Sequence, residues 1–162
     1  MNVHELTGLF RRLGAKAPAE WAESQLHEGI PQLARFLFLR QAWKRIVPED
    51  DPSWIDANID FARREPDAPY AGAGHTLASL RERGATDREV TELVRSMQAE
   101  FLFGLCQLLE DPGIEEPELA DTAWGLFLLD DADRPTIEIG GLHESVLSTD
   151  PSGREARPRP EG

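Results

Sequence analysis

The segment from Thr86 to Glu110 constrains the fold of this chain more than any other stretch. It begins with Thr86-Asp-Arg-Glu89, a pattern in which the threonine hydroxyl and the glutamate side chain cap the first turn of a helix. Apolar residues then recur at steps of three and four: Val90, Leu93, Val94, Met97, Phe101 and Leu108. This spacing predicts one amphipathic helix about 35 Å long, with Phe101 and Leu105 on the side that faces the core.

Most of the chain before this segment also predicts helices. The signals are apolar residues at helical spacing, prolines at first helical positions and glycines just after the last turn. They mark helices over residues 2–13, 19–27, 31–47, 52–64 and 75–83. The AGAGHT stretch at the start of the last of these predicts a loop that leads into the helix. It does not predict a phosphate-binding loop, because such a loop usually follows a buried strand and none precedes it.

The end of the chain follows a different pattern. Residues 124–129 (WGLFLL) are apolar, residues 130–135 (DDADRP) are rich in turn formers, and residues 136–139 (TIEI) alternate. This order predicts a β-hairpin over about residues 124–140. Residues 151–162 are rich in Pro, Gly and Arg and predict a flexible tail. The expected fold is therefore mainly α (α+β): a single multi-helix domain over residues 1–150 with a C-terminal hairpin and a disordered tail.

The charge of the chain limits its partners. The formal net charge is −13, which disfavours binding to nucleic acid or to anionic membranes. From Glu110 to Asp133 there are nine Asp or Glu residues and no Lys or Arg. This stretch is either a solvated surface or a docking patch for a basic protein partner. Basic residues gather in residues 35–45 and in the tail, so head-to-tail homo-oligomers are a further hypothesis.

Other features suggest a soluble, cytoplasmic protein. The N-terminus lacks the basic start and apolar run of a signal peptide, and no apolar segment is long enough to span a membrane. Cys106 is the only cysteine, so no intrachain disulfide forms. Its apolar neighbours predict a buried, unreactive thiol.

The histidines give no strong metal pattern, so we expect no metal and no cofactor. The four are His4, His27, His75 and His143. None belongs to an HExxH or ExxH motif, which would place two ligands on one helical face. Glu23 and His27 are four residues apart, and a weak site at this pair stays open. The chain also lacks a GxSxG or Walker A motif.

The stretch TIEIGGLHES is the main candidate site. Gly140 and Gly141 permit a sharp turn after the hairpin, and His143, Glu144 and Ser145 follow it. We interpret these residues as a structural corner whose polar side chains serve binding. The corner would be anchored by three apolar residues: Leu142, Val146 and Leu147. The hairpin turn adds three further candidate binding residues: Asp130, Asp131 and Asp133.

Three functions remain in competition. The first is protein–protein binding in an inhibitory, immunity-like or regulatory role, without catalysis. The second is a small hydrolase-like enzyme that uses the His143-Glu144-Ser145 turn, although consecutive residues rarely supply the required contact between nucleophile and base. The third is a helical protein that binds a small ligand among aromatic side chains such as Trp43, Trp54 and Tyr70.

Overall fold

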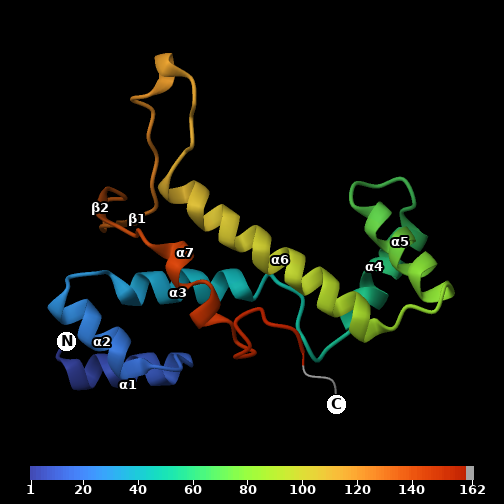
Figure 1. The fold of residues 1–162 in the computed structure, drawn as a ribbon, viewed down its shortest axis with the longest axis horizontal. Helices are drawn as coiled ribbons and strands as arrows, with labels where there is room; N and C mark the ends of the chain where they lie inside the picture. The colour runs from blue at the N-terminus through green and yellow to red at the C-terminus, as the bar shows by residue number, and fades with distance from the viewer. Residues whose placement is uncertain (160–162) are drawn as a thin grey trace. The chain divides into compact units, whose positions relative to one another are not determined.

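The computed structural model describes residues 1–159 and confirms a mainly helical fold with a two-stranded antiparallel hairpin (Figure 1). The elements in chain order are α1 (Val3–Leu13), α2 (Pro18–His27), α3 (Gln32–Trp43), α4 (Ser53–Arg64), α5 (Ala71–Glu82), α6 (Asp87–Glu110), the 3-10 turn η1 (Pro117–Leu119), β1 (Phe127–Leu129), β2 (Pro135–Glu138), α7 (Leu142–Ser145) and the 3-10 turn η2 (Leu147–Thr149). Within residues 1–159, no helix is both long and apolar enough to cross a membrane.

The chain forms two compact units. Unit 1 comprises Met1–Trp43 and Glu100–Ala156, and unit 2 comprises Lys44–Ala99 with the described residues from Arg157 onward. Helix α6 contributes its first part to unit 2 and its second part to unit 1. The expectation of a single domain over residues 1–150 stays a prediction.

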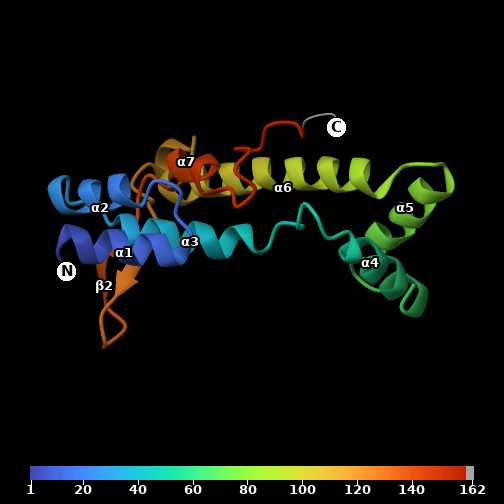
Figure 2. The same ribbon diagram turned by 90° about the horizontal axis from the view of Figure 1, so that it is seen from below.

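The core of unit 1 lies among its three N-terminal helices. Helix α1 packs against α2, and α2 against α3 (Figure 2). Asn2 and Glu5 form a capping box at the start of α1, which satisfies amide groups that the first turn leaves without partners. The rings of Phe10, Trp21 and Phe36 then meet pairwise with centroids 5.4–5.9 Å apart. Such aromatic contacts stabilise the helix triplet beyond the apolar area they bury.

Unit 2 is built on the packing of α4 against α5. Its apolar cluster contains Ile55, Ile59, Leu77 and Val90. The capping box of α6 forms as predicted, since the Glu89 amide donates to Thr86 Oγ1 and the Thr86 amide donates to Glu89 Oε2. The AGAG residues form the first turn of α5 instead of the predicted loop. Helix packing explains the glycine at 74, because a Cβ there would lie 2.1 Å from the carbonyl oxygen of Asn58.

Helix α6 has the predicted length, but the prediction of its buried face is wrong. Phe101 is 72% exposed and Leu105 is also exposed, whereas Leu102 and Cys106 are buried. The helix carries apolar residues on more than one face, so their spacing alone could not show which face packs against the chain.

The hairpin falls within the predicted residues. Phe127 pairs with Glu138 and Leu129 with Pro135, and every residue of the two strands is exposed. The described part of the predicted tail, residues 151–159, begins with turns around the buried Asp150, whose carboxylate accepts from Ser152 and from the Ala156 amide. The remainder of that tail, residues 160–162, lies outside the described residues.

Candidate functional site

The GGLHES stretch forms the predicted corner, and its critical glycine is Gly141. Gly141 has a φ of 66°, in the left-handed region that favours glycine, and it leads directly into α7. Gly140, the other glycine of the predicted turn, is not among the residues with positive φ. Leu142 and Val146 are fully buried and anchor the corner, while Leu147, also expected to be buried, is exposed.

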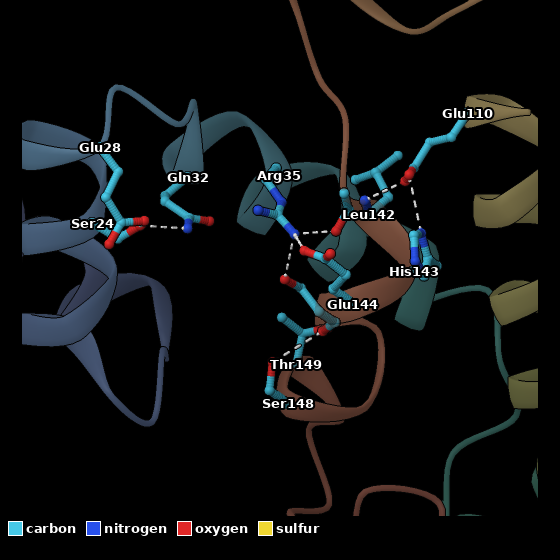
Figure 3. Close-up of polar contacts among 12 residues, drawn as sticks. Ser24, Glu28, Gln32, Arg35, Glu110, Leu142, His143, Glu144, Ser148 and Thr149 are labelled. Atoms are coloured by element: carbon cyan, nitrogen blue, oxygen red, sulfur yellow. Dashed lines mark hydrogen bonds and ion pairs between the residues drawn. The ribbon is translucent and has the colours of Figure 1, made fainter.

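Arg35 of α3 lies at the centre of the corner (Figure 3). Its side chain is only 5% exposed, and its Nη2 donates to the Gly141 carbonyl oxygen, to Ser145 Oγ at 3.0 Å and to Glu144 Oε2 at 3.3 Å. Glu144 itself is 67% exposed, so water screens its attraction to the guanidinium. The buried contacts to Gly141 and Ser145 therefore link Arg35 to the corner more strongly than the ion pair with Glu144 does.

Glu110, the last residue of α6, holds the other side of the corner (Figure 3). Its Oε1 accepts from the Leu142 amide at 2.6 Å, and its Oε2 lies 3.0 Å from His143 Nδ1. Burial alone would raise the pKa of Glu110, but the hydrogen bonds from His143 and from the Leu142 amide together outweigh it and lower that pKa. The His143 ring also meets Phe103 edge-on, with centroids 6.0 Å apart.

The corner residues do not form a nucleophile–base pair among the described contacts. His143 lies against Glu110, whereas the buried Ser145 accepts from Arg35. Adjacent or nearly adjacent residues on a helix point in different directions, which explains this separation. Cys106 offers no activated nucleophile either, because burial and then the nearby Glu110 charge raise the pKa of its thiol to about 11.

The candidate residues of the hairpin turn have a local role. Asp130 accepts from the amides of Ala132 and Arg134 and forms an ion pair with the Arg134 side chain at 2.7 Å. The hydrogen bond from that side chain is the main reason that the pKa of Asp130 is lowered. Asp131 and Asp133 are exposed at the turn. Asp130 thus stabilises the hairpin, and none of the described contacts joins these three acids to α7.

The aromatic candidates belong to different units. Trp43 belongs to unit 1, where its Nε1 donates to the Val146 carbonyl oxygen at 3.0 Å. Trp54 and Tyr70 belong to unit 2, and Tyr70 is 89% exposed. Glu23 and His27 lie on the exposed side of α2. Within residues 1–159, no group of three or more His, Cys, Asp or Glu side chains is placed to hold a metal ion.

Two residues of the site were missed from the sequence. Arg35 interrupts an otherwise apolar stretch, LARFLFL, and a charged residue there signals a buried partner that the sequence does not identify. Glu110 belonged to a run of acids, and nothing in that run distinguishes it from its neighbours.

A hollow of about 420 Å³ opens beside Glu110. It is lined by Gln107, Leu108, Glu110, Asp111, Gly113 and His143. The His143–Glu110 contact therefore forms part of its wall. Leu108 extends the lining onto the exposed side of α6, where Phe101 and Leu105 also lie.

No protein family, no curated protein and no solved structure was found to match this chain.

We expect Glu110→Gln to reduce stability by about 1–2 kcal/mol near pH 7, because it replaces a charge-assisted acceptor of the corner by a neutral one. A folded-state pKa that is lowered adds stability above the pKa of the unfolded carboxyl, and this stability is lost as pH falls through the folded value. The difference from the parent protein should therefore shrink below about pH 4. Urea unfolding from pH 7 to pH 3 measures it, with the exposed Glu115→Gln as control. A difference that stays constant across this range would contradict the assignment.

Proposed function

We propose that this chain is a small acidic binding protein that recognises a basic protein partner, in an inhibitory or regulatory role. The observation that carries the proposal is the exposed apolar row of Phe101, Leu105 and Leu108 on the second part of α6. These residues are three and four positions apart, so they lie on one face of the helix. Contiguous exposed apolar surface on a monomer is typical of interaction sites.

The hairpin supports the same function. Several large apolar side chains on or next to its two strands are exposed: Trp124, Phe127, Leu128, Leu129 and Ile137. An exposed two-stranded hairpin also presents strand edges to which another chain can add. Aromatic side chains are enriched at protein interfaces, and Trp and Tyr are common among the few residues that contribute most of the binding energy.

The charge around these apolar residues favours a basic partner. Between Arg95 and Arg134 the chain has no Lys or Arg, and this stretch includes both the α6 row and the first strand of the hairpin. A basic surface would be attracted to it and would dock faster than a neutral one. A second copy would bring negative charges together, so the proposal favours a different protein over a homo-oligomer.

The corner at α7 supports binding better than catalysis. A catalytic Ser145 would need access to substrate and a hydrogen bond to a base. Ser145 is buried against Arg35, and His143 lies against Glu110. These contacts serve to fix the C-terminal segment to α3 and α6 within unit 1.

The experiment is a selection of displayed random peptides on the immobilised full chain. We expect enrichment of peptides that combine apolar residues with a net positive charge, and loss of their binding in the Phe101→Ser/Leu105→Ser double variant. Leu26→Ser, which changes an exposed apolar residue on α2, is the matched control and should bind as the parent does. Enriched peptides that are neutral or acidic, or that bind the double variant equally well, would refute the proposal.

A further inference from the structure

Four residues of α6 outline a pocket of the kind that receives a side chain from another helix. Phe101, Gly104, Leu105 and Leu108 stand at positions i, i+3, i+4 and i+7, and all four are exposed. In helix pairs, one large apolar side chain of each helix inserts into a hole formed by four such residues of the other. The open face of α6 therefore has the pattern of an acceptor hole, with glycine at one corner.

Gly104 has no role in the packing of the described chain. A Cβ at this position would meet nothing within 4 Å, and the backbone is not in the left-handed region. Glycine inside a helix is destabilising relative to alanine, so a glycine here lowers the stability of the free protein, and no packing contact compensates for this loss. A close approach by another chain provides a physical reason for it.

The hollow beside Leu108 supplies a site for a cation. Two acidic residues, Glu110 and Asp111, belong to its lining, and Asp111 is exposed. The C-terminus of a helix carries partial negative charge, which favours a cation there. The last turn of α6 contains no basic residue to fill this role. The hollow adjoins the hole at Leu108, and its acidic residues Glu110 and Asp111 lie about six residues past the centre of the hole, or roughly 9 Å along the helix direction.

We infer that the partner presents an amphipathic helix, with one large apolar side chain in the hole at Gly104 and a Lys or Arg about two turns away in the acidic hollow. This inference rests on the proposed function and specifies its mode of recognition. On a partner helix, residues seven positions apart lie on the same side at roughly 10 Å, which matches the distance from the centre of the hole to the acidic residues of the hollow. Recognition by an apolar helix face with flanking charge is a known mode of peptide binding.

The test uses synthetic helical peptides of about 18 residues, a length at which an isolated helix is stable enough to bind. One peptide carries a central leucine with lysines seven positions before and after it, and its counterpart carries glutamates at those two positions. We expect the full chain to bind the lysine peptide about tenfold or more tightly than the glutamate peptide. Asp111→Asn should reduce the affinity for the lysine peptide and the salt dependence of its binding.

Gly104→Ala is the decisive variant. It should raise the melting temperature of the free protein, because alanine favours the helix. It should nevertheless reduce the affinity for the lysine peptide about tenfold, because the methyl group overfills the hole. Gly72→Ala is the matched control, since Gly72 is also an exposed helical glycine with nothing within 4 Å of its Cβ, and peptide binding should be unchanged.

Equal binding by the Gly104→Ala variant, or equal affinity for the two peptides, would overturn this inference. The proposed function would still stand if the selected peptides depended on Phe101 and Leu105, so the two failures are distinguishable. A dimer in sedimentation experiments that Gly104→Ala dissociates would assign the hole to a second copy and would also overturn the inference.

Discussion

Replacing Arg35 by methionine is expected to reduce the free energy of unfolding by about 2–4 kcal/mol. Methionine keeps an apolar stem in the buried site but removes every donor of the guanidinium. The Gly141 carbonyl oxygen and Ser145 Oγ then lose the donor that they share. A buried polar group left without a partner costs about 1–3 kcal/mol. The wild-type Nε is itself buried without a partner among the described residues, and its removal offsets a small part of this loss.

The matched control for Arg35→Met is Glu144→Gln. It removes the charge of the ion pair while the buried contacts of Arg35 to Gly141 and Ser145 remain. Because the Glu144 side chain is largely exposed, this change should alter the unfolding free energy by less than about 1 kcal/mol. Urea unfolding followed by circular dichroism measures both variants. Equal losses would mean that the ion pair, and not the buried hydrogen bonds, stabilises the corner.

Local features of the fold were predictable from the sequence because their causes are local. The capping box at Thr86 and Glu89 lies within four residues, and the hairpin turn at Asp130 is closed by its own neighbours. The length of α6 follows from an apolar repeat that continues without a proline or a turn signal. In each case the residues that determine the structure are those that form it.

The buried face of α6 was not predictable for the opposite reason. Leu102 and Cys106 share one side of the helix, and Phe101 and Leu105 lie one residue earlier, on the neighbouring side. Both sides are apolar, so the hydrophobic pattern allowed either to face the core. Only the packing of the rest of the chain selects between them, and the apolar side that remains exposed became the basis of the proposed function.

The candidate site was found in part. The corner itself follows from two glycines and the apolar residues around them. Its partners come from elsewhere in the chain: Arg35 is 106 residues from Gly141, and Glu110 is 33 residues from His143. Contacts over such separations depend on tertiary packing, which neither composition nor spacing reports. The same limit applies to the choice between Gly140 and Gly141, because the sequence shows two glycines and the fold needs the left-handed backbone at one.

We expect Gly141→Val to reduce the free energy of unfolding by about 2–4 kcal/mol. A β-branched residue is strained at a φ of 66°, and a Cβ at this position would lie 2.7 Å from Arg35 Nη2. The end of an arginine side chain can usually move aside. Here it is buried and bonded to Gly141 and Ser145, so any movement breaks the contacts that hold the corner.

Two further variants separate the causes of the Gly141 effect. Gly140→Val is the matched control: its backbone is outside the left-handed region and a Cβ there would meet nothing within 4 Å, so we expect a change below about 1 kcal/mol. Gly141→Asn tests how much of the loss of stability comes from backbone strain, because asparagine tolerates the left-handed region but still places a Cβ against Arg35. Asparagine should therefore recover part of the loss at 141 and not all of it. Complete recovery would show that backbone strain alone requires glycine at 141, and a larger loss at 140 than at 141 would place the critical turn at Gly140 after all.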